Sequence, residues 1–213
     1  MAQKITAIER QKKNPKRVSV YLNDQFAFGL SEIIAGWLHV GQELSEAEIA
    51  DLQRKDSEEV AYQKTLNFLS YRVRSVKEIR DYLKKHKTPP EITATIIERL
   101  IDLKLLDDHT FAKTWVENRE AFRPRSKRVL RIELRQKGIN EEIIRQVLEP
   151  VNDQKSAIRL ASKQSRKYAG LEWFEFRKKL SAFLARKGFD YGTISPIVSQ
   201  TWNEMTIKTN TDE

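Results

Sequence analysis

Apolar residues recur along most of this chain in a pattern with a period of about 50 residues. Three pairs of apolar residues, each spaced by four, lie 51 and then 50 residues apart. They are Ile79 with Leu83, Leu130 with Leu134, and Leu180 with Leu184. Residues four apart share one face of a helix. Each pair therefore predicts a helix with one buried face.

Each of these helices is followed by a break and then by another apolar helix. The breaks are His86 to Pro90, Lys137-Gly138 and Lys187-Gly188. The apolar pairs beyond them are Ile96-Ile97, Val147-Leu148 and Ile197-Val198. Helices are also expected upstream, over Ala61 to Leu69, over Phe111 to Val116 and from Ala157 onward. The unit is therefore three short helices, and units this small bury their apolar surface by packing on their neighbours.

The first 30 residues follow a different pattern, one typical of strands. Ile5 to Ile8 predicts a short strand, and Val18 to Leu22 and Phe26 to Leu30 predict a hairpin closed by Asn23-Asp24. Arg10 to Arg17, with five basic residues around Pro15, indicates an exposed basic loop. Farther on, Ser45 to Glu48 forms a capping box that begins a helix through Leu52.

These patterns predict a mainly α protein. We expect three tandem three-helix repeats in an elongated array, preceded by a small N-terminal segment with a β-hairpin and short helices. The expected boundaries are 1–56 for the N-terminal segment, 57–107, 108–152 and 153–205 for the three repeats, and 206–213 for a tail.

Composition excludes several classes of chemistry. None of the 213 residues is Cys, which excludes disulfides, thiolate zinc sites, iron–sulfur clusters and thiol catalysis. The three His residues are scattered and no glycine-rich phosphate loop is present, so we expect no metal and no cofactor. No apolar run approaches the roughly 18 residues of a membrane span, and no signal peptide is visible. We therefore expect a cytoplasmic protein without a membrane partner, and a monomer.

The chain carries a net charge of +9, and the excess grows along its length. Residues 1–56 hold eight basic and eight acidic residues, whereas residues 153–213 hold eleven basic and seven acidic ones. A basic protein attracts polyanions such as nucleic acid, an acidic protein surface or anionic lipid. Charge alone does not choose among them.

Basic residues form two stripes at equivalent positions of the first two repeats. Each stripe has the spacing i, i+3, i+7 and lies about 100° around the helix from the apolar pair, so it is expected to be exposed. The stripes are Lys77, Arg80 and Lys84, and Arg128, Arg131 and Arg135. A solvated helix face is the ordinary explanation of one stripe. Two equivalent stripes favour a binding surface, to which Arg contributes bidentate contacts with phosphate or carboxylate.

Further basic residues extend this candidate surface. Arg123, Arg125 and Lys127 precede the second stripe, and Glu133 is the one acidic residue between 123 and 135. The third repeat keeps Lys178 of the stripe and adds Lys179, Arg186 and Lys187.

Two other groups of residues have an ordinary structural explanation. Asp107-Asp108 is an acidic pair of the kind a metal-dependent nuclease uses, but Asp108 is better placed as a helix N-cap. Aromatic residues gather in the second and third repeats, and we expect them mainly in the core and between repeats rather than stacked on bases. They are Trp115, Phe122, Trp173, Phe174, Phe176, Phe183 and Phe189.

Three stretches resemble a known family in their order and spacing. They are Leu66-x-x-Leu69-x-x-Arg72-x-Arg74-Ser75-x-x-Glu78-Ile79-x-x-Tyr82-Leu83, Asp107-Asp108-x-x-Phe111-Ala112-x-x-x-Val116-x-x-Arg119, and the continuous run from Arg128 to Ile139. Together they are similar to the RecX family, regulators of the RecA recombinase. The resemblance covers residues 57–150 well and the third repeat more loosely.

This resemblance implies a non-enzymatic regulator with the RecA–ssDNA filament as its partner. Family members bind in the groove of that filament and limit ATP hydrolysis, strand exchange and coprotease activity, which affects recombination, DNA repair and the SOS response. Single- or double-stranded DNA is a further expected partner. Two alternatives stay open, namely a protein that binds nucleic acid directly, with no recombinase-specific role, and a metal nuclease that uses Asp107 and Asp108.

Overall fold

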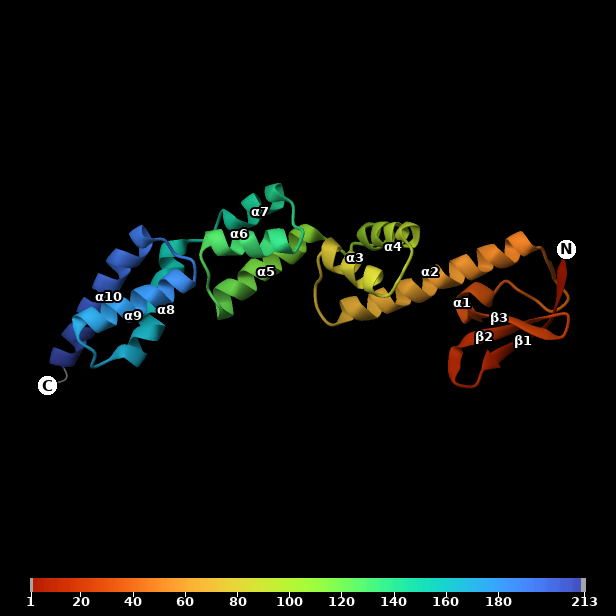
Figure 1. Cartoon of the computed structure of the whole chain (residues 1–213), viewed down its shortest axis with the longest axis horizontal. Helices are drawn as coiled ribbons and strands as arrows, with labels where there is room; N and C mark the ends of the chain where they lie inside the picture. The colour runs from red at the N-terminus through yellow and green to blue at the C-terminus, as the bar shows by residue number, and fades with distance from the viewer. Residues whose placement is uncertain (1, 212–213) are drawn as a thin grey trace. The chain divides into compact units, whose positions relative to one another are not determined.

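The computed structural model describes residues 2–211, and these form two compact units. One unit contains the chain up to Arg72 together with Ile79–Leu105. The other contains Val73–Glu78 together with the residues from Leu106 onward. Figure 1 shows the N-terminal strands followed by helices only, which confirms the mainly α fold with a small β segment at its start.

The N-terminal strands form one antiparallel sheet of order β3-β2-β1-β4. The strands are β1 (Gln3–Gln11), β2 (Asn14–Leu22), β3 (Gln25–Ser31) and β4 (Glu43–Leu44), and the short helix α1 (Glu32–Ala35) follows β3. The expected hairpin at Asn23-Asp24 is present, with φ of 49° and 65° at these two residues. Two positive φ values give the turn a twist that matches the strands it joins.

The expected basic loop over Arg10 to Arg17 is wrong. These residues belong to the paired ends of β1 and β2, and the turn between the strands is only Lys12-Lys13. Pro15 is tolerated because the strand register shifts there and a bulge requires no regular ladder bond. The side chain of Arg17 points to α2 (Glu46–Ser70), where its Nη2 binds the Asp56 carboxylate at 2.8 Å.

Helix α2 begins at the predicted capping box of Ser45 and Glu48. It does not end at Leu52 but continues to Ser70, so the two helices expected over 46–52 and 61–69 are one. No Gly or Pro interrupts this stretch, and backbone hydrogen bonding continues unless a residue breaks it. The helix therefore crosses the boundary expected at residue 56.

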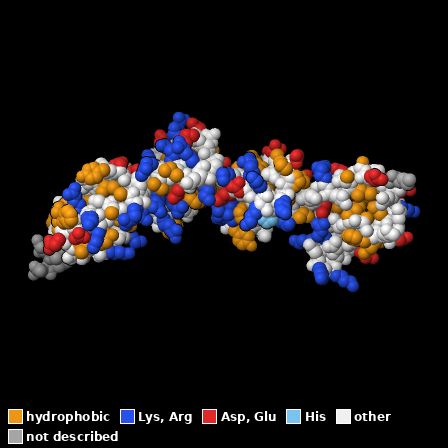
Figure 2. Space-filling model, viewed as in Figure 1, with side chains coloured by type: hydrophobic (Ala, Val, Ile, Leu, Met, Phe, Trp, Pro, Cys, Tyr) orange, Lys and Arg blue, Asp and Glu red, His pale blue; other side chains and the backbone are white. Residues whose placement is uncertain are grey.

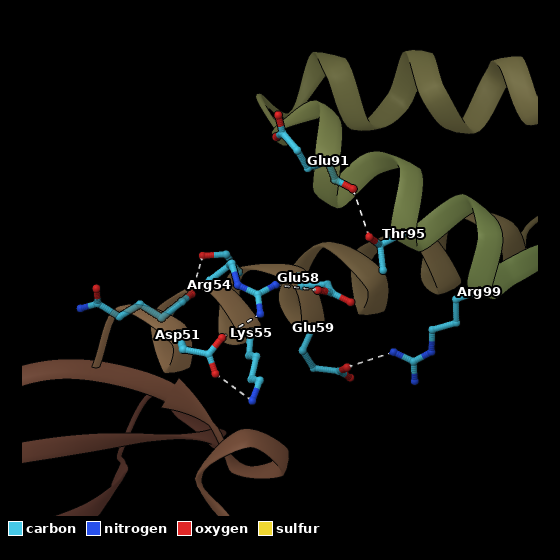
Figure 3. Close-up of polar contacts among 10 residues, drawn as sticks. Asp51, Arg54, Lys55, Glu58, Glu59, Glu91, Thr95 and Arg99 are labelled. Carbon is cyan, nitrogen blue, oxygen red and sulfur yellow. Dashed lines mark hydrogen bonds and ion pairs between the residues drawn. The ribbon is translucent and has the colours of Figure 1, made fainter. Parts of the chain in front are cut away.

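Two buried acidic residues explain why α2 serves both the sheet and the first repeat. Asp56 accepts hydrogen bonds from Arg17 and, at 2.5 Å, from the Ser31 amide at the end of β3. One turn farther on, Glu59 pairs at 3.5 Å with Arg99 of α4 (Pro90–Asp102), as Figure 3 shows. Burying a carboxylate is costly unless it is paired, so these contacts fix both faces of α2.

Three three-helix repeats follow the sheet, as predicted. The first uses the end of α2 with α3 (Val76–Lys85) and α4. The second is α5 (Asp108–Phe122), α6 (Lys127–Gln136) and α7 (Glu141–Leu148). The third is α8 (Asp153–Ser165), a 3₁₀ turn (Arg166–Tyr168), α9 (Trp173–Arg186) and α10 (Tyr191–Thr211). Helix α10 covers the start of the expected tail, whose residues 212 and 213 lie outside the described residues.

The apolar pairs that defined the period form the cores of the repeats. All twelve predicted core residues are buried, and none is more than 8% exposed. They are Ile79, Leu83, Ile96 and Ile97 in the first repeat, Leu130, Leu134, Val147 and Leu148 in the second, and Leu180, Leu184, Ile197 and Val198 in the third. At about 25 cal/mol per Å² of apolar surface, burial of these side chains is the main stabilising term in each repeat.

The three predicted breaks share one backbone conformation. Lys87, Gly138 and Gly188 have φ of 57°, 80° and 96°, the left-handed conformation that ends a helix. The next amide after each donates back to the helix, to the carbonyl of Leu83, Leu134 or Leu184. The same local geometry therefore ends the middle helix of every repeat.

A serine at the start of a middle helix contacts the break of another. The Ser126 Oγ accepts from the Val129 amide, which caps α6, and donates to the Gly188 carbonyl at 2.8 Å. Ser75 has the same role at the start of α3, where its Oγ accepts from the Glu78 amide and donates to the Lys137 carbonyl at 2.8 Å. We call the contacts of Ser75 and Ser126 the first and second junction.

The second junction predicts that position 188 is sensitive to a single added carbon. A Cβ on Gly188 would lie 2.2 Å from the Val129 Cγ2, whereas a Cβ on Gly170, which also has a positive φ, meets no atom within 4 Å. We expect Gly170→Ala to cost about 1 kcal/mol of backbone strain. Gly188→Ala should cost about 1–3 kcal/mol more from overpacking. Equal unfolding midpoints in urea for the two variants would refute this account of the junction.

Candidate functional site

The second basic stripe lies on the exposed side of α6, opposite the buried pair Leu130 and Leu134. Arg128, Arg131 and Arg135 are all exposed, as the spacing predicted. In Figure 2 the blue side chains of Lys and Arg gather over α6 and α7 on the face in view. The helix therefore presents its cations to solvent.

Glu141 at the start of α7 partly neutralises this stripe. Its two carboxylate oxygens lie 3.3 Å from the Arg131 Nε and 2.8 Å from the Arg135 Nε. The hydrogen bond from Arg135, together with the charges of both arginines, holds the pKa of Glu141 below its usual value. These groups are exposed, so the ion pairs contribute little to stability and an incoming anion competes with them readily. Arg128 forms no ion pair with any described residue.

Glu133, the one acidic residue of the 123–135 segment, does not neutralise the stripe. Its Oε2 accepts hydrogen bonds from the Trp115 Nε1 at 2.9 Å and the Arg119 Nε at 2.8 Å, both on α5. The Trp115 ring also lies beneath the cations of Arg119 and Lys137. Glu133 therefore binds side chains inside the second repeat and does not lower the charge of the stripe.

The first stripe is exposed as well. Lys77, Arg80 and Lys84 lie on the solvent side of α3, whose buried residues are Ile79 and Leu83. Lys77 belongs to the segment that forms the first junction, and its stem fills the space where a Cβ on Gly138 would lie. Arg80 and Lys84 belong to the other compact unit.

The structure brings together four predicted cations that are far apart in sequence. The loop after α5 carries Arg123 and Arg125, and the end of α9 carries Arg186 and Lys187. The Arg125 Nη1 donates to the Arg186 carbonyl at 3.2 Å. Burial lowers the pKa of Lys187, and the charges of Arg125, Arg123 and Arg186 lower it further. We call these four residues the junction cluster.

The remaining predicted cations lie outside this cluster. The Lys127 Nζ donates to the Glu149 carbonyl, and its backbone amide donates to Asp153 at 2.7 Å. Lys178 and Lys179 are exposed on the first half of α9. Seven or eight residues of helix separate them from Arg186, which is about 10–12 Å at 1.5 Å per residue.

The acidic pair has structural duties that correct our prediction by one residue. Asp107, not Asp108, is the N-cap of α5, and it accepts hydrogen bonds from the amides of His109 and Thr110 at 3.0 Å. Asp108 is the first residue of the helix, and its carboxylate accepts from the Val76 amide at 2.9 Å. In the described part of the chain, no group of three or more His, Asp or Glu side chains is arranged to hold a metal.

Two aromatic residues depart from the expectation of core packing. Phe176 and Phe189 are buried, Trp115 and Phe183 are partly buried, and Trp173 is 37% exposed with its ring beside that of Trp202. Phe122 and Phe174 are 80% and 71% exposed. Phe122 is the last residue of α5 and directly precedes Arg123 in the sequence, so an exposed aromatic ring adjoins the junction cluster along the chain. Sequence patterning missed this ring because a terminal helical residue has no periodicity to place it.

Comparison with known proteins gives one consistent result. Family models match four consecutive stretches: the regulatory protein RecX N-terminal domain over residues 3–45 and the first, second and third three-helix domains of RecX over 61–100, 107–148 and 152–198. The regulatory protein RecX of Bacillus subtilis is 35% identical over 201 residues, which cover 92% of this chain and 76% of that relative. That of Oceanobacillus iheyensis is 35% identical over 207 residues, with the same two shares.

Solved structures agree with these matches. A crystal structure of regulatory protein RecX superposes with a TM-score of 0.72 and 32% identity, covering 92% of this chain and 98% of that one. A crystal structure of RecX from Lactobacillus salivarius gives 0.61 and 28%, covering 69% and 97%. Among the helices of residues 2–211, none combines the length and apolar character that a membrane span requires.

The N-cap assignment predicts how acid affects stability. Hydrogen bonds from Thr110, with those from the His109 amide, keep the pKa of Asp107 below its usual value despite some burial. The pKa of Asp107 in the unfolded chain is about 4, and above that pH the cap contributes its full stabilisation. The stabilisation is lost as the pH falls through the lower pKa of the folded state. We expect Asp107→Ala to cost about 1 kcal/mol at pH 7 and less as the pH approaches 2. Asp107→Asn should retain most of the stability at pH 7, and urea unfolding at several pH values measures both.

Proposed function

Because this chain belongs to the RecX family of regulatory proteins, we propose that it binds the RecA–ssDNA filament along its groove. Binding inhibits the filament's ATPase, strand exchange and coprotease activities and so modulates recombination and DNA repair. The observation that carries the proposal is that the family matches cover the sheet and all three repeats. The proposal therefore concerns the whole chain and not one repeat.

The exposed cations are the contacts we propose for this partner. Acidic side chains of a protein filament and phosphates of its DNA both attract such a surface, and the attraction speeds association. Arginine also pairs with either group through two parallel hydrogen bonds. The proposed residues are Lys77, Arg80, Lys84, Arg123, Arg125, Lys127, Arg128, Arg131, Arg135, Lys178, Lys179, Arg186 and Lys187.

In this proposal the protein is a non-enzymatic, cytoplasmic monomer that needs no cofactor. The name of its family, regulatory protein, supports a regulator rather than a catalyst. The second candidate is a protein that binds nucleic acid directly, without a recombinase-specific role. One observation favours it, namely the exposed ring of Phe122 next to Arg123, since aromatic rings among cations are typical of single-strand binding.

A titration of the cognate recombinase separates the two candidates. We expect this protein to inhibit ssDNA-dependent ATP hydrolysis at concentrations well below those that coat the DNA, because the filament and not the strand is its target. Affinity for naked ssDNA is measured in the same buffer. Inhibition that begins only when the DNA is saturated would indicate competition for the strand and would favour the direct nucleic-acid binder.

Charge reversal on α6 tests the proposed contact surface. We expect Arg128→Glu, Arg131→Glu and Arg135→Glu together to raise the concentration for half-inhibition at least about tenfold, a loss of about 1.4 kcal/mol in binding. The fold should persist, because the buried residues of α6 are Leu130 and Leu134.

A matched control reverses three other exposed cations, Lys163, Arg166 and Lys167, and so has the same net charge. We expect a much smaller effect from it. An unchanged inhibition constant in the folded α6 variant, or an equal loss in both variants, would refute the assignment of this stripe.

A further inference from the structure

The junction cluster concentrates four positive charges from two repeats at one place. Arg123 and Arg125 lie just before the Ser126 cap of α6, and Arg186 and Lys187 lie at the end of α9. The Ser126 amide and hydroxyl bind the carbonyls of Lys187 and Gly188, which holds the two segments together. The backbone therefore positions these charges, and they converge even though they repel one another.

No described residue compensates these charges with an ion pair. The Arg125 Nε is buried, and within residues 2–211 it has no hydrogen-bond partner. The Lys187 Nζ lies over the ring of Phe183, 5.2 Å from its centroid. The lowered pKa of Lys187, caused by burial and then by its three cationic neighbours, reflects the same excess of charge. The negative end of the α9 dipole offsets part of this excess, and the Arg125 Nη1 donates to a carbonyl there, but none of the three arginines has a carboxylate partner among the described residues.

The first junction also joins a serine cap to a helix break, but its charge balance is different. There Lys137 occupies the position of Lys187, and its Nζ pairs with the Glu78 carboxylate at 2.7 Å. The residue equivalent to Glu78, 51 positions later, is Val129. Because of this one difference between the repeats, Lys137 has an acidic partner at the first junction and Lys187 has none at the second.

We propose that the second junction is a binding site for phosphate groups of single-stranded DNA, with the junction cluster as the cationic contact and Phe122 as a platform for a base. Arginine forks match the oxygens of a phosphodiester, and a cluster without its own carboxylates has no internal competitor for them. The acidic side chains of a protein partner would also pair with these arginines, through their carboxylates. The exposed ring beside Arg123 favours the nucleic acid, because bases stack on aromatic side chains and carboxylates do not.

The first test removes two charges without touching the core. Binding of fluorescent (dT)30 is followed by anisotropy over a range of salt concentrations. We expect Arg123→Gln with Arg186→Gln to weaken binding at least tenfold. The slope of log affinity against log salt should fall by about 1.4, since each lost ssDNA phosphate contact contributes about 0.7. The matched control is Arg159→Gln with Lys163→Gln, two exposed charges on α8 outside the proposed contacts, which should change both quantities much less.

The second test exchanges the charge balance of the two junctions. Val129→Glu gives Lys187 the acidic neighbour that Lys137 has, and we expect it to weaken (dT)30 binding about tenfold. Glu78→Val removes that neighbour from Lys137 and should strengthen binding. Circular dichroism and thermal unfolding check that each variant is folded. Val129 is half-buried, so the glutamine variant decides the question if Val129→Glu fails to fold.

Three results would overturn the proposal: no (dT)30 binding by the unaltered protein at low salt, unchanged binding in the folded glutamine variant, or equal losses in that variant and its control. Loss of recombinase inhibition with unchanged (dT)30 binding would assign the cluster to an acidic protein surface instead. The inference extends the proposed function but is measured without recombinase. A protein that binds (dT)30 through this cluster and never inhibits the filament would refute the proposed function alone.

Discussion

The hydroxyl group of Ser126 holds together the second junction, where the cations of the junction cluster converge. It accepts from the Val129 amide and donates to the Gly188 carbonyl, so one atom both begins α6 and fixes the end of α9. Gly188 fits this contact because any side chain there would strike Val129 and Ser126. Ser75 likewise caps α3 and donates to the Lys137 carbonyl, beside Gly138, with a different set of charged neighbours. Both junctions thus join a serine cap to the break after a middle helix, although the serine hydroxyl binds the Lys137 carbonyl in one and the Gly188 carbonyl in the other.

Much of the fold was predictable because it depends on periodicity. The apolar pairs such as Leu130 and Leu134 are buried where the spacing placed them, and the breaks at Gly138 and Gly188 end helices. The resemblance to RecX, drawn from motif order, is confirmed by all four family matches. These features depend either on neighbouring residues or on a repeat at a fixed spacing, and both kinds of pattern are visible in a single sequence.

Other features depend on contacts that local patterns do not encode. The loop expected around Pro15 is a paired hairpin because a bulge absorbs the proline. The cap of α5 is Asp107 because the next residue, Asp108, bonds a distant amide. Each cation of the candidate surface was recognisable as basic and exposed. That Arg123 lies near Lys187 follows only from the packing of one repeat on the next.

Helix α2 joins the sheet and the first repeat more closely than their separate family matches suggest. Asp56 binds the sheet and Glu59 binds α4, and only two residues lie between these two anchor points. A rotation of the helix that improves one contact misplaces the other. We therefore expect the sheet and the first repeat to evolve as one unit and not as independent modules. Insertions or deletions between Asp56 and Glu59 should be rare among relatives, because each would rotate one of these carboxylates away from its partner.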